Sequence, residues 1–187
     1  MKRRRINVRV ISGRCRGTHL EAPEGQNTRP TTDRIKETLF NMIAFDMPEC
    51  EFLDLFSGSG AMAIECLSRG GKRAVLVEKD PTALACIERN LEKTRLKSGA
   101  SVLGEDVIKA LEKIEGQSFD VIFMDPPYAL ENIEQILKIL AEKAFLKEDG
   151  YIILERSTKS IVKLPQNLVL WKEKQYKTTT LSFIKKG

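Results

Sequence analysis

From residue 51 onward, short apolar runs alternate with longer amphipathic segments, and this alternation constrains the fold more than any other feature of the sequence. The runs are almost continuously apolar, which is typical of strands in a sheet that helices cover on both faces. Strand–helix alternation at this spacing predicts a parallel, doubly wound α/β sheet. The expected strands cover 51–56, 73–78, 101–103, 119–124 and 150–155. The expected helices cover 60–69, 82–95, 106–114 and 131–144. Two terminal strands are expected over 167–174 and 178–185, joined by a turn near Tyr176.

The N-terminal part of the chain departs from this pattern. Residues 7–11 and 18–21 flank a glycine-containing turn and predict a short β-hairpin. A helix is expected from Thr31 or Thr32 to about Phe45, because its apolar residues recur on one face and threonine is a good helix cap. We therefore expect a basic arm with a hairpin in residues 1–30 and the main domain in residues 31–187.

Positive charge is concentrated at the same end. The chain carries a formal net charge of +5, yet residues 1–36 alone contain ten Lys or Arg and three acids, which leaves the remainder at −2. Such a basic face suggests a polyanionic partner such as nucleic acid. A solvated tail that promotes solubility is the alternative, and composition does not separate the two.

Several classes of protein are disfavoured by what the sequence lacks. There is no apolar run of eighteen residues for a membrane span, and no apolar stretch follows the basic N-terminus as in a secretory signal. The four cysteines form no C-x-x-C pair, and His19 is the only histidine, so neither a metal site nor a His-based catalytic triad is expected. Dispersed cysteines of this kind indicate reduced thiols in the cytoplasm.

A glycine-containing loop follows the first strand of the main domain. In Asp54-Leu55-Phe56-Ser57-Gly58-Ser59-Gly60 the glycines let the backbone turn sharply and approach a ligand closely. Glu78 ends the next strand, twenty residues after Gly58, where an acid can accept hydrogen bonds from a ribose diol. The loop suits S-adenosylmethionine, but its G-x-G-x-x-A pattern also suits NAD, and a plain tight turn is the structural alternative.

Three observations favour S-adenosylmethionine over NAD. Asp54 precedes the glycines by four residues, where a methyltransferase uses an acid to organise the loop and the methionine ammonium group. The loop does not begin the chain, and no Lys, His or Tyr is placed to transfer a proton beside a hydride. Asp106, after the third strand, can meet the adenine amino group or cap a helix, and both roles can hold at once. The residues assigned to the cofactor are Asp54, Phe56, Ser57, Gly58, Gly60, Glu78, Lys79, Asp106 and Val107.

The tetrapeptide Asp125-Pro126-Pro127-Tyr128 begins at the carboxyl end of the strand over 119–124, and this is the edge of an open α/β sheet where ligands bind. An amino nitrogen on a nucleic-acid base is a poor nucleophile, because its lone pair is delocalised into the ring. Acceptors at the Asp125 carboxylate and at a carbonyl near Pro126 can direct that lone pair toward a methyl donor. The prolines fix φ and preorganise the loop. Tyr128 can stack on the base, which is worth about 1–3 kcal/mol.

A proline-rich turn is the alternative for this tetrapeptide, but its position after the fourth strand, downstream of Asp54, Gly58, Gly60 and Glu78, favours methylation of an amino group. Methylation at carbon 5 of a pyrimidine is disfavoured, because that chemistry needs a cysteine nucleophile and no cysteine lies near the tetrapeptide.

The ordered blocks of the sequence resemble a bacterial family, the 16S (small-subunit) ribosomal RNA guanine-N2-methyltransferases. The resemblance spans nearly the whole chain. It is most specific in the block Arg29-Pro30-Thr31-Thr32-Asp33-Arg34-Ile35-Lys36-Glu37-Thr38-Leu39-Phe40-Asn41. The other matching blocks are Arg9-Val10-Ile11-Ser12-Gly13, Arg16-Gly17, Asp54–Gly60, Glu78 and Asp125–Tyr128. Ser12 and Ser57 stand where the family often has Ala or Gly. The glycine loop and the tetrapeptide also occur in adenine-N6 enzymes.

The resemblance implies a seven-stranded class I methyltransferase fold (Rossmann-like) with an antiparallel last strand, S-adenosylmethionine as cofactor, and a guanine of 16S rRNA as the target. It also implies that the N-terminal hairpin binds RNA, with phosphate contacts that give affinity rather than sequence choice. Arg29 and Thr31 could contact either the methionine carboxylate or an RNA phosphate, and the alternative is that Thr31 merely caps the helix while Arg29 is solvated. The residues assigned to RNA are Arg3, Arg4, Arg5, Arg9, Arg14, Arg16, Arg29, Thr31 and Arg34.

The sequence thus predicts a monomeric, cytoplasmic S-adenosylmethionine-dependent rRNA (guanine-N2)-methyltransferase that acts on 16S rRNA, either naked or in a small ribosomal subunit. An adenine-N6 methyltransferase of DNA or RNA is the alternative within the same chemistry. An NAD-dependent oxidoreductase and a catalytically idle RNA-binding module are the alternatives from other classes.

Overall fold

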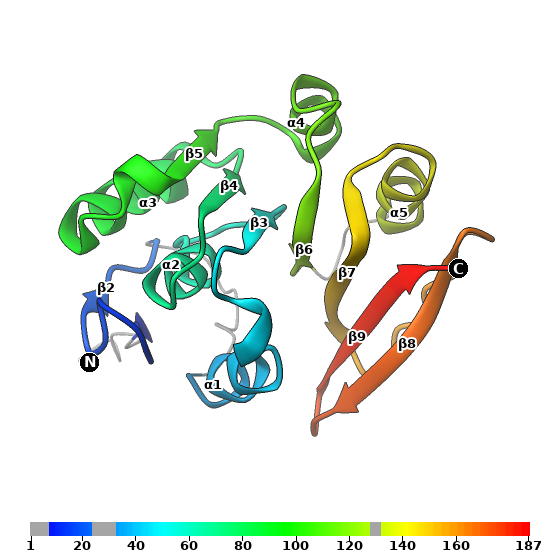
Figure 1. Ribbon diagram of the computed structural model, residues 1–187, viewed down its shortest axis with the longest axis horizontal. Helices are drawn as coiled ribbons and strands as arrows, with labels where there is room; N and C mark the ends of the chain where they lie inside the picture. Colours follow the sequence, from blue (N-terminus) through cyan, green and yellow to red (C-terminus); the bar gives the residue numbers. More distant parts are fainter. Residues whose placement is uncertain (1–7, 24–32, 128–131) are drawn as a thin grey trace, which may run out of the picture.

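A computed structural model describes residues 8–23, 33–127 and 132–187. Its main feature is a seven-stranded sheet in the order β5-β4-β3-β6-β7-β9-β8 (Figure 1). The strands are β3 (Glu51–Asp54), β4 (Arg73–Val77), β5 (Ala100–Leu103), β6 (Phe119–Met124), β7 (Leu146–Ser157), β8 (Leu168–Gln175) and β9 (Thr179–Lys186). Strands β3 to β7 pair in parallel, and β9 runs antiparallel between β7 and β8. The predicted sheet with an antiparallel last strand is confirmed.

Helices cover both faces of this sheet, as the apolar strands predict. They are α1 (Asp33–Met42), α2 (Ala61–Ser68), α3 (Pro81–Thr94), α4 (Val107–Lys113) and α5 (Ile133–Glu142), with short 3₁₀ turns at Ala44–Asp46 and Lys97–Gly99. α1, α2 and α3 lie on one face and α4 and α5 on the other (Figure 1). Of the helices in the described part of the chain, none has the length and apolar character that crossing a bilayer requires.

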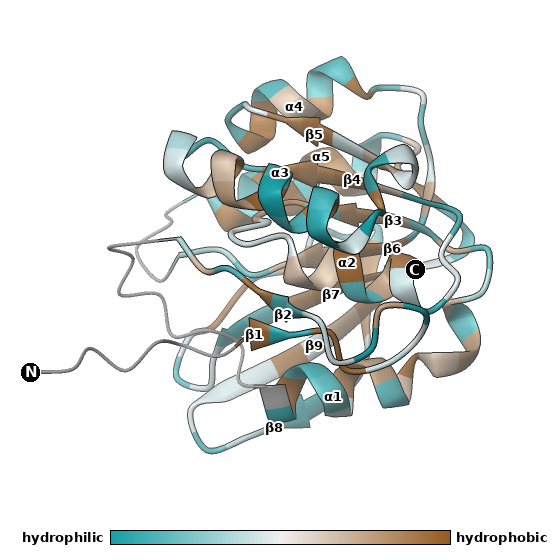
Figure 2. Cartoon of the chain, turned by 90° about the vertical axis from the view of Figure 1, so that its left-hand side faces the viewer, coloured by the Kyte–Doolittle hydropathy of each residue, from teal (hydrophilic) through white to brown (hydrophobic). Residues whose placement is uncertain are grey.

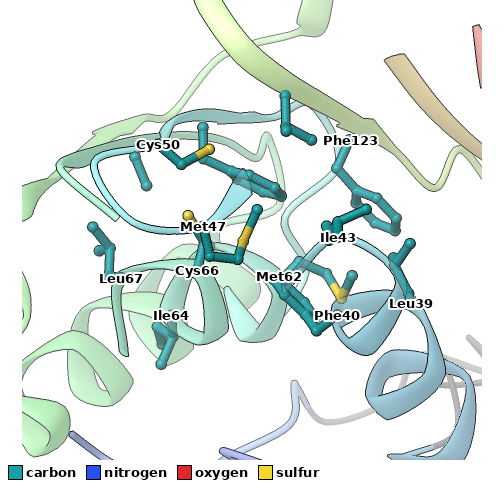
Figure 3. Close-up of a cluster of buried hydrophobic side chains, with 14 of the residues drawn as sticks. Leu39, Phe40, Ile43, Met47, Cys50, Met62, Ile64, Cys66, Leu67 and Phe123 are labelled. Atoms are coloured by element: carbon teal, nitrogen blue, oxygen red, sulfur yellow. The ribbon is translucent and has the colours of Figure 1, made fainter. Parts of the chain in front are cut away.

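Successive strand residues contribute to two separate cores. Phe123 of β6 and Ile153 of β7 pack toward α1–α3, whereas their neighbours Ile122 and Leu154 pack toward α4 and α5. Figure 3 shows the first core, where Phe40 of α1 lies among side chains of α2 and β6. Figure 2 shows the hydrophobic strands in the interior and hydrophilic outer faces on the helices. The two cores hold the carboxyl ends of the central strands at one edge of the sheet.

Strand β7 is longer than expected. The sequence predicts a strand over 150–155, but pairing begins at Leu146, which faces Phe119 of β6 ahead of a register irregularity. Lys147, Glu148 and Asp149 follow Leu146, and this polar stretch hides the start of the strand. Gly150 allows the close approach, because a Cβ there would lie 2.8 Å from the carbonyl oxygen of Phe119.

The predicted N-terminal hairpin is present. Strands β1 (Val8–Arg9) and β2 (His19–Leu20) pair antiparallel and lie over α2 and α3 (Figure 1). Val10 and Leu20 are 1% and 5% exposed and join the core on that face. The hairpin therefore contributes to the main core and is no loose appendage.

Glu65 of α2 anchors the hairpin from inside the protein. Its fully buried carboxylate accepts hydrogen bonds from the backbone N–H groups of Ile11 (2.8 Å) and Ser12 (2.9 Å). Arg69, the residue that follows α2, donates to it at 2.8 Å, and the Lys36 ammonium of α1 lies at 3.6 Å. A buried carboxylate is costly unless it is paired and hydrogen-bonded, and here both conditions are met.

Two further contacts fix the ends of the hairpin. At its turn, the N–H of Arg14 donates to the carbonyl of Ser68, and a Cβ on Gly13 would lie 1.9 Å from that same oxygen. At its other end, the Asn90 side chain of α3 accepts from the N–H of Glu21 and donates to the carbonyl of Ser59 in the glycine loop. The hairpin thus spans α2 from its carboxyl end to the loop at its amino end.

Candidate active site

The candidate active site lies at the carboxyl ends of β3 and β6, in the centre of the sheet. The chain passes from β3 to β4 on one side and pairs β3 with β6 on the other, so the strand order reverses here. Open α/β sheets bind ligands at such a point. Asp54 ends β3 opposite Phe123 of β6, and Asp125 follows two residues later. The acids predicted from the sequence for the cofactor and for catalysis therefore lie at the carboxyl ends of neighbouring strands.

The glycine loop turns tightly from β3 into α2. Gly58 and Gly60 have φ values of +54° and +76°, in the left-handed region that favours glycine. The Ser57 hydroxyl donates to the carbonyl of Asp54 at 3.0 Å, and the N–H of Gly60 donates to the carbonyl of Ser57. A Cβ on Gly60 would lie 3.2 Å from the Leu76 side chain. The predicted sharp turn is confirmed, and its tightness brings the start of α2 against the sheet.

Asp54 is the most unusual residue of this loop. Its side chain is fully buried, and among the described residues no hydrogen-bond partner reaches either carboxylate oxygen. Burial raises the pKa of Asp54 to about 7, with a smaller contribution from the charge of Glu78, although the nearby backbone N–H groups of Phe56 and Ala63 oppose this rise. Unsatisfied buried acids are rare and concentrate at functional sites. A ligand ammonium group would supply the cation that the described residues do not place beside Asp54.

Glu78 has a role in the loop that the sequence analysis missed. One carboxylate oxygen accepts from the N–H of Gly58 at 2.9 Å, and the other accepts from the N–H groups of Lys79 and Asp80. Glu78 therefore ties the glycine loop to the start of α3. A carboxylate oxygen has two lone pairs, so these bonds leave capacity for the predicted ribose contact.

The other residues predicted to bind the cofactor include Asp106, Phe56, Lys79 and Val107. Asp106 caps α4 by accepting from the N–H of Ile108 at 3.1 Å, which confirms the capping interpretation. Its side chain is exposed, so the predicted adenine contact remains open to it. Phe56 is partly exposed, Lys79 is exposed and Val107 is buried.

The structure describes the first three residues of the predicted catalytic tetrapeptide. Asp125 is partly buried, Pro126 is buried and Pro127 is exposed, whereas Tyr128 lies outside the described residues. Burial raises the pKa of the Asp125 carboxyl well above its usual range, and the charges of Glu155 and Asp54 raise it further. An acid held this way can accept hydrogen bonds when ionised and can also receive a proton.

Glu155 is an acid of this site that the sequence analysis missed. It lies near the end of β7 and is 9% exposed. A signal was present in the sequence, because Glu78 ends the expected strand over 73–78 and Asp125 follows the expected strand over 119–124. The expected strand over 150–155 ends in the same way, on the strand adjacent to β6.

The structure places the predicted RNA-binding arginines on the outer surface. Arg9, Arg14, Arg16 and Arg34 are exposed, whereas Arg3, Arg4, Arg5, Arg29 and Thr31 lie outside the described residues. Arg14 and Arg16 belong to the hairpin turn beside Ser68, at the end of α2 farthest from the glycine loop. An eight-residue helix is about 12 Å long, so these arginines suit a large partner that extends well beyond the site.

Comparison with known proteins places this fold and this site in one family. Residues 8–185 match the family described as "Conserved hypothetical protein 95". The chain is 38% identical to Bacillus subtilis YlbH, named provisionally as an rRNA methyltransferase, over 96% of this chain and 99% of that protein. It is 36% identical to Haemophilus influenzae "Ribosomal RNA small subunit methyltransferase D", over 89% and 88%.

A solved structure of a hypothetical protein from Thermus thermophilus superposes on this fold with a TM-score of 0.81 at 32% identity, covering 94% of this chain and 98% of that one. The family resemblance predicted from the sequence is therefore confirmed, and the chain belongs to the family that includes the ribosomal RNA small subunit methyltransferase D proteins.

Proposed function

We propose that this protein transfers a methyl group from S-adenosylmethionine to the exocyclic N2 amino group of a guanine in 16S rRNA. The observation that carries the proposal is the pair of acids, Asp54 and Asp125, at the carboxyl ends of adjacent strands where the strand order reverses. Relatives at 34–36% identity bear the name ribosomal RNA small subunit methyltransferase D. The cytoplasm, where ribosomes are assembled, is then its place of action.

The assignment of S-adenosylmethionine follows from the chemical groups that Asp54 and the glycine loop can bind. Asp54 presents two orphaned carboxylate oxygens that suit the ammonium group of the methionine part. In this proposal Glu78 accepts hydrogen bonds from the ribose and Asp106 accepts one from the adenine amino group. The diphosphate of NAD is negative and would be repelled by a buried acid at the start of the loop, so Asp54 favours S-adenosylmethionine over NAD. S-adenosylmethionine supplies an electrophilic sulfonium methyl group.

Asp125 provides the chemistry on the substrate side. Its ionised carboxylate accepts an N–H of the base amino group, which orients the nitrogen lone pair toward the methyl group. Positioning of this kind lowers a barrier by several kcal/mol. The amine becomes more acidic as its new C–N bond forms, and the raised pKa of Asp125 allows this carboxylate to take the released proton. Pro126 and Pro127 fix the backbone that presents it.

The central experiment identifies the atom of the rRNA that receives the methyl group. Purified protein is incubated with tritiated S-adenosylmethionine and with 30S subunits, or their 16S rRNA, from a strain that lacks the gene. We expect label on the N2 group of one guanine. Label on adenine N6 would support the alternative methyltransferase, and absence of label together with a thermal shift by NAD rather than S-adenosylhomocysteine would support the oxidoreductase.

A second expectation concerns the basic arm. Deleting residues 1–20 would remove Val10 and Leu20 from the core, so charge substitutions test RNA binding more cleanly. Changing both Arg14 and Arg16 to Gln is expected to weaken RNA binding and to reduce the slope of log K against log salt by about one unit per lost phosphate contact. The measurement is filter binding across a salt series.

The matched control for that experiment is Lys109→Gln, which removes a positive charge from the exposed surface of α4 on the opposite face of the sheet. Its slope is expected to equal that of the wild type. If the Arg14 and Arg16 substitutions also left the slope unchanged, the hairpin turn would not contact RNA phosphates.

A further inference from the structure

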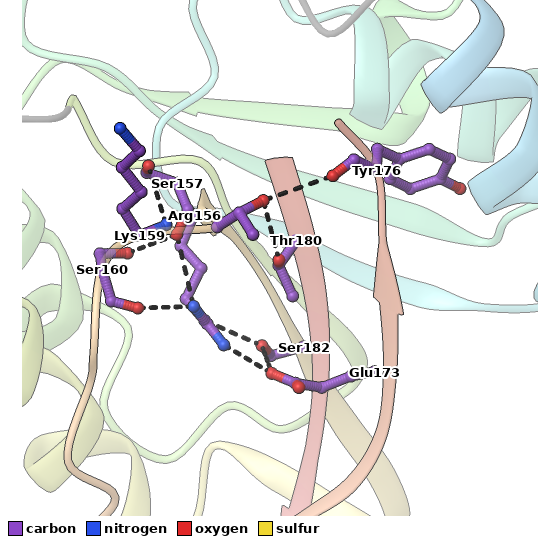
Figure 4. A network of polar contacts seen from close by, with 9 residues as sticks. Arg156, Ser157, Lys159, Ser160, Glu173, Tyr176, Thr180 and Ser182 are labelled. Carbon is purple, nitrogen blue, oxygen red and sulfur yellow. Dashed lines mark hydrogen bonds and ion pairs between the residues drawn. The ribbon is translucent and has the colours of Figure 1, made fainter. Parts of the chain in front are cut away.

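Residues 157–187 form a second basic segment, which the net charge of the whole chain conceals. They carry seven lysines and one acid, whereas residues 37–156 carry a formal charge of −8. The acid, Glu173, accepts hydrogen bonds from Arg156 and Ser182 within the sheet (Figure 4). Because Glu173 is paired with Arg156, it does not neutralise the lysines, and a surface of this charge suits a polyanionic partner.

Trp171 is the extra residue of a β-bulge in β8, the edge strand of the sheet. The residues on either side of it pair with Ile184 and Phe183, which are consecutive on β9. Bulges redirect a side chain, and this one places the indole 6.0 Å from the ring of Tyr151 and 6.4 Å from that of Phe183, measured between ring centroids. These two buried rings hold the indole in place, although 55% of Trp171 is exposed.

Three lysines share this face of the sheet with Trp171, namely Lys172, Lys174 and Lys185. The first two pair across the sheet with Phe183 and Leu181, which belong to the core under α1–α3, and cross-strand partners lie on the same face. The ammonium nitrogen of the third lies 4.0 Å from the centroid of the Trp171 ring. In the described part of the chain, no acid forms an ion pair with any of the three. Trp171 and these three lysines together are called the β8 surface below.

Protection of the sheet edge accounts for only part of the β8 surface. Lysines on an edge strand keep it from pairing with another sheet, but a half-exposed indole promotes the association that these lysines oppose. An aromatic ring among lysines is instead the arrangement that binds single-stranded nucleic acid, because bases stack on the ring and the cations contact phosphates. A second copy of this chain is a poorer partner, since it would bring the same positive charges together.

We propose that the β8 surface binds the rRNA substrate, with the indole of Trp171 stacked on an unpaired nucleotide and the lysines at the phosphates. This inference rests on the proposed function, which supplies the rRNA. Lys174 lies level with Glu155 at the carboxyl edge of the sheet, because both pair with Leu181. β8 is three strand spacings from β6, so the surface begins about 14 Å from the end of β6, where Asp125 follows.

The β8 surface and the N-terminal hairpin flank the candidate active site. Figure 1 shows β2 and β8 at opposite sides of the molecule, with β3 and β6 between them. Contacts on both sides would hold the RNA around the target base. Because the β8 surface does not touch the reacting atoms, its contacts are equal in the ground state and the transition state, and their loss raises KM without changing kcat.

The first test uses the fluorescence of Trp171, which is the only tryptophan of the chain. Titration with 16S rRNA from a strain that lacks the gene is expected to quench this emission saturably, because a stacked base quenches indole fluorescence. Heparin, a polyanion without bases, should leave the emission nearly unchanged. Equal quenching by heparin, or binding of rRNA without quenching, would overturn the inference. Quenching that follows protein concentration in the absence of RNA would overturn it in favour of a second copy of the chain.

The second test measures methyl transfer by variants of the surface. Trp171→Ala is expected to raise the KM for 16S rRNA about tenfold at unchanged kcat. Leu170→Ala is the matched control, because Leu170 is 50% exposed on the same strand and pairs with Ile184 of the opposite core. Its KM should equal that of the wild type. An unchanged KM in Trp171→Ala, or an equal rise in both variants, would overturn the inference.

A double variant, Lys172→Gln with Lys174→Gln, keeps the test decisive if Trp171→Ala destabilises the terminal strands, because both lysines are exposed. It should reduce the slope of log K against log salt by about one unit per lost phosphate contact, and an unchanged slope would overturn the inference. If the wild type binds 16S rRNA with quenching but transfers no methyl group to it, the proposed function fails, whereas the β8 surface stands as an RNA-binding site.

Discussion

Replacing Asp125 by Ala is expected to reduce the rate of methyl transfer at least about a thousandfold while S-adenosylhomocysteine still binds with nearly wild-type affinity. The carboxylate is removed from the position that orients the target amine, and Asp54 and the glycine loop remain intact. Single-turnover transfer of labelled methyl to rRNA measures the first effect, and isothermal titration measures the second.

Asp149→Asn provides the control for this prediction, because it removes a carboxylate from an exposed position on β7. It should change neither quantity. If Asp125→Ala lost cofactor binding in proportion to activity, Asp125 would belong to the cofactor site and the role proposed for it would be wrong.

Replacing Asp54 by Asn is expected to weaken S-adenosylhomocysteine binding more than about a hundredfold, because a buried charged pair loses one member. The same change should stabilise the free protein at pH 8. The folded pKa of about 7 lies above the ordinary value of 3.8. The folded state therefore holds the proton more tightly than the unfolded state, and stability falls as the pH rises from about 4 to 7.

The Asp54→Asn variant has no carboxyl group to ionise at this buried position, so its stability does not fall in this way as the pH rises. Its free energy of unfolding should exceed that of the wild type by roughly 2–4 kcal/mol at pH 8, and the difference should shrink toward pH 4. Urea unfolding at several pH values measures it. A difference of equal size at pH 5 and pH 8 would show that Asp54 is not the titrating group, and wild-type cofactor affinity in the variant would remove Asp54 from the binding site.

Much of the fold could be predicted because both faces of its strands are buried. A strand such as β6 must then be apolar throughout, and its predicted bounds are those observed. The start of β7 could not be predicted, because Lys147, Glu148 and Asp149 are polar and the pairing there depends on Gly150 approaching β6. Local sequence does not encode that approach.

The site was partly predictable for a related reason. Acids at the ends of apolar runs mark the carboxyl edge, and Glu78 and Asp125 were found in this way, whereas Asp54 was found by its position four residues before the glycines. Glu65 could not be found, because a glutamate within a helix is ordinary and its amide partners lie more than fifty residues earlier in the chain. What makes it unusual is burial, which arises only when the hairpin and α1 pack against α2.

The anchoring of the hairpin by Glu65 and Asn90 also bears on how the protein folds during synthesis and how it can be engineered. The first strands to leave the ribosome have their partners 53 to 69 residues later, so the hairpin cannot settle until α3 has emerged. A chimera that exchanges this hairpin between relatives must therefore carry the matching residues of α2 and α3 with it.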